Sequence, residues 1–331
     1  MQMMMLRAPI ALLLCLLAAG CGTARAIGQH GTMIVRVPLA DLRAEPGTTA
    51  QPGTHDANQE TQLLYGEIVK VVKQDQGWAN VEAVEQPEWS HANRWQGYPG
   101  WVKSEDLLPV NNLMAPNIMV IEPWAPTYFD AFTRSPSPHR YPMGARLHAI
   151  DMGGELWRIE PFEGGTVWMP GKFARGMDEL AALPAKDRRP LILDAAKRLI
   201  GQAYYWGGRS AKAPGAAHSV LGVDCSGLTN LAYRVAGVNI PRDAHEQFLR
   251  AKRVTALEPA DLIFLSAQDD PDRIVHVMLY AGNGAVIEGP GTGMAVRAIS
   301  LRDRLGRGLD RLAPGDVIDG QTVSFGSYLA E

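Results

Sequence analysis

The feature that most limits the fold is a series of short alternations of apolar and polar residues, broken repeatedly by turn residues. The pattern fills residues 32–110 and returns over residues 117–173. With 34 Gly and 23 Pro in 331 residues, the chain has turns at a density that suits short strands better than a helical bundle. The sequence therefore predicts two small β-barrels or sandwiches, over residues 32–110 and 111–176.

The pattern changes near Arg175, after which the chain becomes mixed in character. Residues 177–189 are polar and interrupted by proline, so we interpret them as a linker. Residues 191–200 then place apolar side chains at helical spacing, and this predicted helix ends at Gly201. A third domain of helices and strands is expected over residues 190–331, which makes the whole chain α+β.

Composition excludes several classes of protein. The chain has 32 basic and 35 acidic residues, a formal net charge of -3, and this balance argues against a nucleic-acid binder. Three cysteines cannot form a disulfide scaffold or a four-thiolate zinc site. No other cluster has metal-ligand spacing, so we expect neither a metal nor a cofactor.

The N-terminus has the pattern of an export signal. Arg7 precedes the apolar residues 8–17, small residues follow, and Cys21 comes next, which predicts a secretory signal peptide over residues 1–20. The ending resembles the lipobox of bacterial lipoproteins. That resemblance implies that Cys21 is lipidated and anchors the protein to a membrane in the cell envelope. Plain secretion, with cleavage near Ala24 or Ala26, is the alternative.

One cysteine, Cys225, lies well inside the third domain. Residues 228–237 form an amphipathic pattern that ends at Gly237, so Cys225 is expected at or near the N-terminus of a helix. The free N–H groups and the positive end of the helix dipole favour a thiolate there. A lone cysteine is more often an inert buried residue, so a nucleophile also needs a base within reach.

His276 is the candidate base. It interrupts an apolar strand over residues 274–280, which is followed by a Gly-Asn-Gly turn and a second strand over residues 285–288. A three-residue loop centred on Gly282 would place Glu288 directly opposite His276, whereas a two-residue loop would shift that register. In the first case Glu288 could orient the imidazole, as in a catalytic triad.

Five motifs in residues 190–300 resemble the NlpC family of peptidoglycan cysteine endopeptidases, which have a papain-like fold. They are Ala203-Tyr204-Tyr205-Trp206-Gly207-Gly208, Asp224-Cys225-Ser226-Gly227, Ile240-Pro241-Arg242-Asp243-Ala244, Pro259-Ala260-Asp261-Leu262-Ile263-Phe264 and His276-Val277 with its Gly-Asn-Gly turn. The resemblance implies Cys225 as nucleophile, His276 as base and Glu288 at the third polar position, where histidine is common.

The N-terminal segments resemble bacterial SH3 domains, on motifs at residues 41–46, 62–67, 77–81 and 97–102. Members of the family with two such modules resemble γ-D-glutamyl-L-diamino-acid endopeptidases, which act on stem peptides with a free L-alanine amine. That resemblance implies a set of substrate-binding residues. They are Tyr204, Ser226, Asp243 with its neighbour Arg242, Tyr98 from the first module, and either Glu60 or Glu67.

The sequence leaves several alternatives open. The substrate could instead be intact, cross-linked peptidoglycan, with the SH3-like modules anchoring the enzyme to the wall, or the chain could be a non-catalytic envelope-binding lipoprotein. Asp243 could simply cap a helix that starts at Ala244. The long segment 210–223, with Lys212 and His218, could be a solvated loop or could contact the diamino acid.

Overall fold

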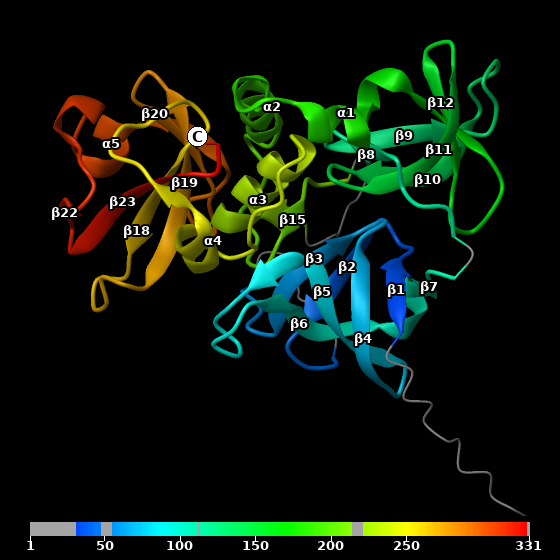
Figure 1. Cartoon of the computed structure of the whole chain (residues 1–331), viewed down its shortest axis with the longest axis horizontal. Coiled ribbons are helices and arrows are strands. Elements are labelled where there is room, and N and C mark those ends of the chain that lie inside the picture. The colour runs from blue at the N-terminus through cyan, green and yellow to red at the C-terminus, as the bar shows by residue number, and fades with distance from the viewer. Residues whose placement is uncertain (1–30, 48–54, 112, 214–220, 330–331) are drawn as a thin grey trace, which may run out of the picture.

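The computed structural model describes residues 31–47, 55–111, 113–213 and 221–329. The predicted signal peptide, Cys21 and His218 lie outside these residues. The described chain forms two β modules and a C-terminal domain of helices and strands, and all three pack against one another (Figure 1). Among the described helices, none combines the length and the apolar character needed to cross a bilayer.

The first module is one seven-stranded antiparallel sheet with the strand order β3-β2-β6-β5-β4-β1-β7. Alternate residues of these strands point inward, which is the period-two pattern of the sequence. The strands are β1 (Thr32–Val35), β2 (Leu39–Arg43), β3 (Gln59–Leu64), β4 (Ile68–Asp75), β5 (Trp78–Glu88), β6 (Gln96–Lys103) and β7 (Leu107–Pro109), with the 3-10 helix η1 (Ser104–Asp106) before β7.

The second module repeats this topology strand for strand. Its order, β10-β9-β13-β12-β11-β8-β14, is that of the first module with every number raised by seven. The strands are β8 (Ile118–Val120), β9 (Trp124–Tyr128), β10 (Pro136–Pro142), β11 (Arg146–Gly153), β12 (Leu156–Glu160), β13 (Val167–Pro170) and β14 (Ala174–Gly176), with the 3-10 helix η2 (Gly171–Phe173) before β14. The repeated topology accounts for the repeated sequence pattern.

The C-terminal domain packs helices against an antiparallel sheet of order β17-β23-β18-β19-β20-β21. Every residue of α3 is buried, so this helix forms the centre of the domain. The helices are α1 (Met177–Ala182), α2 (Ala185–Arg198), α3 (Cys225–Val235), α4 (Ala244–Arg250), α5 (Leu301–Leu305) and the 3-10 helix η3 (Leu309–Arg311). The strands are β15 (Arg209–Ser210), β16 (Gly222–Val223), β17 (Lys252–Arg253), β18 (Leu262–Ser266), β19 (Ile274–Gly282), β20 (Ala285–Glu288), β21 (Arg297–Ser300), β22 (Val317–Ile318) and β23 (Gln321–Ser327).

The segment that the sequence assigns to a linker is helical. Residues 177–189 contain α1 and the start of α2, and Pro190 lies inside α2. The polar side chains that suggested a linker hold the helices in place: Arg188 donates to the carbonyls of Ala181, Leu183 and Ala236. The bond to Ala236 joins residues 48 positions apart, and such a contact leaves no signal in the local pattern of residues.

A buried ionic network joins the three parts of the molecule. Glu67 of the first module lies 3.0 Å from Arg209 Nη1 and 3.4 Å from Arg234 Nη1, and all three side chains are at most 2% exposed. Glu85, also of the first module, pairs with Arg234 and with Arg146 of the second. Because paired buried charges tolerate little displacement, the network fixes the first module against the C-terminal domain.

Replacing Glu67 with Gln should lower the free energy of unfolding by about 3–5 kcal/mol, because it leaves buried guanidinium groups without their shared anion. The measurement is urea denaturation followed by circular dichroism. Glu105, whose side chain is 77% exposed in the same module, provides the control, since Glu105→Gln should change stability by less than about 0.5 kcal/mol. Equal effects of the two substitutions would contradict this account of the network.

Candidate active site

Cys225 is the first residue of α3, as the sequence predicts. Asp224 is the N-cap of this helix, and its Oδ1 accepts from the Gly227 N–H at 2.6 Å. A Cβ at position 227 would lie 2.2 Å from the Gly208 carbonyl oxygen, so this motif position has no room for a side chain. Cys225 is 7% exposed and lines a cavity. The sulfur is therefore accessible and lies where backbone N–H groups favour negative charge.

His276 on β19 is hydrogen-bonded to the Cys225 thiol on one side and to Glu288 on the other. Its Nε2 donates to Glu288 Oε2 at 2.8 Å, which leaves Nδ1 as the nitrogen available to the thiol. Burial lowers the pKa of His276, but the hydrogen bonds with Cys225 and Glu288 outweigh it and raise the pKa to about 9. The structure thus brings together the three residues predicted to form the catalytic set.

The hairpin that brings Glu288 to His276 differs from the predicted one. The turn has two central residues, Asn283 and Gly284, with φ of +53° and +71°, the conformation that favours Asn-Gly. Such a loop alone would put Glu288 and His276 on opposite faces. A bulge between Tyr280 and Gly282 shifts the register by one residue, so that Leu279 pairs with Ile287. Glu288 therefore contacts His276 as a diagonal neighbour on the same face.

Glu288 is completely buried and has two partners that sequence reasoning missed. Arg297 on β21 and Arg304 on α5 both donate to its carboxylate. Burial alone would raise the pKa of Glu288, but hydrogen bonds from His276 and the two arginines lower it to about 2. Glu288 is consequently an anion across the physiological pH range.

Two carboxylates share one hydroxyl group at another part of the cavity. The Tyr98 hydroxyl lies 3.0 Å from Glu60 Oε2 and 2.9 Å from Asp243 Oδ2. A phenol carries one proton, so it satisfies only one carboxylate at a time. The arrangement leaves acceptor capacity that a cation with several N–H donors could fill. Of the two glutamates that the sequence leaves open, Glu60 lines the cavity and Glu67 belongs to the buried network.

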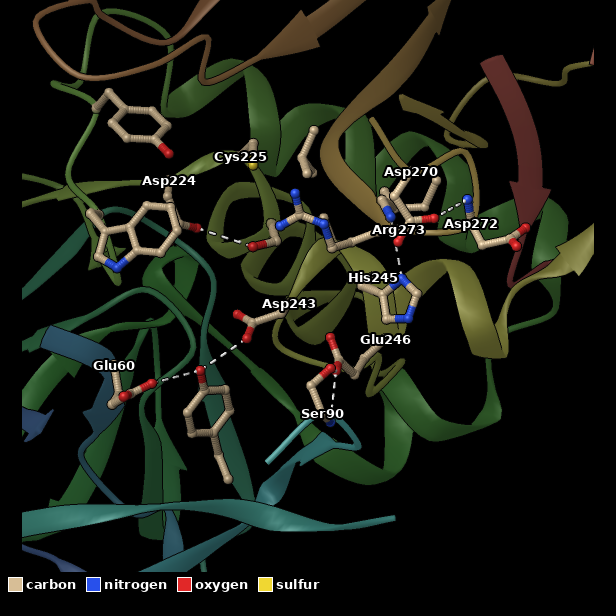
Figure 2. A pocket seen from close by; sticks show the side chains of 17 residues that line it. Glu60, Ser90, Asp224, Cys225, Asp243, His245, Glu246, Asp270, Asp272 and Arg273 are labelled. Carbon is tan, nitrogen blue, oxygen red and sulfur yellow. Dashed lines mark hydrogen bonds between the residues drawn. The ribbon is translucent and has the colours of Figure 1, made fainter. Parts of the chain in front are cut away.

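Asp243 is positioned as the N-cap of α4, but its side chain makes no capping hydrogen bond. The carboxylate instead faces Tyr98 in the cavity (Figure 2). Burial raises the pKa of Asp243 to about 7, against the opposing charge of Arg242. The simple capping role considered for this residue therefore does not describe its side chain.

The remaining predicted residues divide into two groups. Tyr204 and Ser226 line the same cavity as Cys225. Arg242 is fully buried behind the cavity, where its Nη1 and Nη2 bind the Asp224 carboxylate at 3.0 and 2.8 Å. It supports the N-cap of α3 rather than lining the site. Lys212 is exposed and does not line the cavity.

The connection between β5 and β6 of the first module, residues 89–95, forms part of the cavity wall. Ser90 lines the cavity, and its N–H donates to Glu246 on α4 at 3.1 Å. The Arg250 guanidinium, also on α4, stacks 3.7 Å from the centre of the Trp95 ring. His91 lies 3.6 Å from Glu60 and 3.0 Å from Glu88, and these two carboxylates raise the pKa of His91 to about 9 against the effect of burial. The first module is thus a structural part of the site.

The cavity has a volume of about 620 Å³ and is lined by Cys225 together with residues of the first module and of the C-terminal domain. Glu60 and Asp243 lie on one side in Figure 2, and Arg273 projects across from the loop between β18 and β19. Its guanidinium pairs only loosely with the exposed Asp269, at 3.6 Å. The cavity therefore combines the nucleophile with the carboxylates of Glu60 and Asp243, and the loop that carries Arg273 also places Asp270 and Asp272 on the wall.

The sequence of the C-terminal domain matches a family model described as the NlpC/P60 family, over residues 201–305. A Bacillus cereus protein named gamma-D-glutamyl-L-lysine dipeptidyl-peptidase is 29% identical over 252 residues, which cover 73% of this chain and 70% of that protein. A Bacillus subtilis protein of the same name is 26% identical over 251 residues, which cover 74% of this chain and 77% of that protein.

The fold also matches a solved structure. The crystal structure of an NlpC/P60 family protein from Bacillus cereus ATCC 10987 superposes with a TM-score of 0.70 at 23% identity, covering 91% of this chain and all of that one. The match confirms the predicted class: an α+β chain in which a β-rich N-terminal region, consistent with SH3-like modules, precedes a papain-like domain.

Proposed function

We propose that the chain is a cysteine peptidase acting on peptidoglycan stem peptides, and the match of residues 201–305 to the NlpC/P60 family model supports this. The scissile bond joins the γ-carboxyl group of D-glutamate to the diamino acid, and the preferred substrate has a free N-terminal L-alanine. The relatives named gamma-D-glutamyl-L-lysine dipeptidyl-peptidase support this bond and this dipeptide product.

The chemistry follows from the contacts of Cys225 and His276. His276 Nδ1 takes the thiol proton, and the sulfur attacks the γ-carbonyl carbon to form a tetrahedral intermediate. The backbone N–H of Cys225 at the start of α3 can donate to the oxyanion. The intermediate collapses to a thioester as His276 protonates the leaving amine. Water, deprotonated by His276, then hydrolyses the thioester and releases the dipeptide acid.

The observation that carries the proposal is the pair of carboxylates around the Tyr98 hydroxyl. An N-terminal ammonium group would add charged donors to Glu60 and Asp243, whereas an acylated amine could not form an ion pair with either carboxylate. Hydrogen bonds with His91 and Tyr98, acting against burial, hold the pKa of Glu60 below its usual value. Negative charge is therefore present to receive the ammonium.

The Arg273 guanidinium also fits this substrate. A γ-linked D-glutamyl residue keeps its α-carboxylate free, close to the scissile bond. Arg273 projects across the cavity, and its ion pair with the exposed Asp269 is a loose one, so it could pair with that carboxylate. Acidic and basic groups of the cavity would then meet opposite charges on one short peptide.

Two alternatives are less well supported. An enzyme for intact, cross-linked peptidoglycan needs an open cleft, but Glu60, Ser90 and Tyr98 of the first module line this cavity beside Cys225. A non-catalytic role leaves the hydrogen-bonded set of Cys225, His276 and Glu288 without a purpose.

Incubation of the purified protein with L-Ala-γ-D-Glu-diaminopimelate provides the test. The proposal expects equimolar L-Ala-γ-D-Glu and free diaminopimelate by mass spectrometry. Release of alanine instead would contradict the assigned bond. Lysine in place of diaminopimelate would define the preference for the leaving group.

We also propose that the protein acts in the cell envelope, after removal of residues 1–20 and lipidation of Cys21. Its substrate class is a component of the cell wall, which agrees with export. Fatty-acid labelling that persists in a Cys21→Ser variant would contradict the anchor.

The affinity for the free amine should depend on pH through Asp243. With a pKa of about 7, Asp243 gains a proton as the pH falls below that value and loses the charge that attracts the ammonium. KM should therefore rise about tenfold per pH unit below about 7, while the substrate amine, with a pKa of about 7.7–8.0, sets the upper limit. Steady-state kinetics between pH 5 and 9 measure this, and a KM that stays constant from pH 7 to pH 5 would contradict it.

A further inference from the structure

Three cationic side chains converge on the one buried carboxylate that contacts His276. The carboxylate of Glu288 accepts from Arg297 Nε and Nη2 at 3.1 and 2.8 Å, and from Arg304 Nε at 2.9–3.0 Å. Its Oε2 also accepts from His276 at 2.8 Å. Every contact is within ordinary hydrogen-bonding distance. A triad needs only the bond to histidine, so the two arginines require a separate explanation.

The two arginines reach Glu288 from different elements. Arg297 is the direct cross-strand partner of Glu288 in the pairing of β20 with β21. Arg304 comes from α5, a helix closed by the Ser300 side chain at its start and by Gly306 at its end. The carboxylate is thus held in two directions, and it cannot rotate away from the imidazole without breaking several charged hydrogen bonds.

We propose that Arg297 and Arg304 are positioning residues, which fix the Glu288 carboxylate against His276 and limit how strongly it stabilises the imidazolium. The inference rests on the proposed function only in taking Cys225 and His276 as the reacting pair. Besides Cys225, the charged and titratable groups around His276 on β19 are Glu288 on β20, Arg297 on β21 and Arg304 on α5. Cys225 on α3 also interacts with Tyr204, which precedes β15.

The direction of the effect follows from electrostatics. A lone buried carboxylate beside His276 would strongly favour the protonated ring. Two guanidinium groups neutralise part of that charge and also repel a proton on the ring. Their joint effect leaves Glu288 oriented and ionised, while His276 can still release its proton to the leaving amine. Removal of either arginine should therefore make the imidazolium harder to deprotonate.

The test compares Arg304→Gln, Arg304→Lys and wild type by the pH dependence of two reactions. One is peptide hydrolysis, and the other is alkylation of Cys225 by iodoacetamide, followed at the Cys225-containing peptide by mass spectrometry. Because alkylation needs no substrate, it separates a failure of this inference from a failure of the proposed function. Arg302→Gln, on the exposed side of the same helix, is the matched control.

Deprotonation of His276 produces a transition in the plot of the Cys225 alkylation rate against pH. In Arg304→Gln the midpoint of this transition should move up by about 0.5–1 pH unit. The value of kcat should fall about tenfold with KM nearly unchanged, because the lost interaction acts on the reacting groups. Arg304→Lys should restore the wild-type transition, since it keeps the charge, and should recover part of kcat. Arg302→Gln should match wild type in both reactions.

If Arg304→Gln folds and the pH midpoint of its His276 transition in the alkylation profile equals that of wild type, the proposal is overturned. Arg304 would then have only a structural role. If circular dichroism shows that this variant does not fold, Arg297→Gln takes its place, since the Arg297 side chain is 37% exposed and its loss disturbs less packing. The same upward shift is then required of Arg297→Gln, and its absence would overturn the proposal.

Discussion

Replacement of Cys225 with alanine is expected to lower kcat/KM for the stem peptide by about 10⁴-fold or more, because the nucleophile of a coupled catalytic set carries nearly all of its effect. Without the sulfur there is no thioester, and the only remaining route is direct attack by water. The measurement is release of diaminopimelate under single-turnover conditions. The substrate should still bind, since the carboxylates that receive its amine are unchanged.

The control for this variant is to show that it folds and binds substrate as the wild-type protein does. Cys225 is small and lies at the start of a helix that Asp224 caps, so the alanine variant should have the wild-type circular dichroism spectrum and bind the substrate in calorimetry. Hydrolysis at more than about one tenth of the wild-type rate would mean that another group performs the attack. Cysteine peptidase chemistry would then be excluded for this cavity.

Replacement of Asp243 with asparagine is expected to lower kcat/KM for the free-amine peptide by about 10- to 10²-fold, since a hydrogen bond to a charged group contributes about 1.5–3 kcal/mol and the Asp243 side chain is partly exposed. Asparagine keeps the shape of the side chain but presents an amide where the ammonium needs an anion. Activity toward the N-acetylated peptide should barely change, because that peptide makes no ion pair with Asp243. Parallel kinetics on the two peptides measure the difference.

Two further variants make this result specific. Glu60→Gln should show a smaller loss of the same kind, since Glu60 is the other carboxylate beside the Tyr98 hydroxyl. Asp272→Asn is the matched control, because Asp272 lines the same cavity but belongs to the loop before β19. Equal losses in Asp243→Asn and Asp272→Asn would indicate a general effect of negative charge rather than a specific site for the amine.

Local features of the site could be predicted from the sequence because neighbouring residues determine them. The amphipathic pattern after Cys225 marks a helix start, and a strand with one polar interruption marks His276. The pairing of His276 with Glu288 was predicted, but through the wrong register. The prediction counted loop residues, whereas the structure reaches the same face by a two-residue turn and a bulge. The bulge depends on both the geometry of the turn and the packing of the strands, and the spacing of residues along the sequence does not reveal it.

Contacts between distant segments could not be derived in the same way. Tyr98 and Asp243 are 145 residues apart and belong to different domains, so only the resemblance to a family suggested that they meet. Whether Glu60 or Glu67 lines the cavity depends on which of the two faces the cleft and which faces the buried arginines. Arg297 and Arg304 could not be predicted as partners of Glu288, because most arginines lie on the solvated surface and their sequence context does not distinguish the exceptions.

The most direct test of the proposed specificity is the ratio of kcat/KM for L-Ala-γ-D-Glu-diaminopimelate to that for its N-acetylated form, measured on the wild-type protein at pH 7.5. Recognition of an ammonium by Glu60, Tyr98 and Asp243 predicts that the free-amine peptide is preferred by about 10³-fold or more. Equal cleavage of the two peptides would contradict the assignment of this end of the cavity.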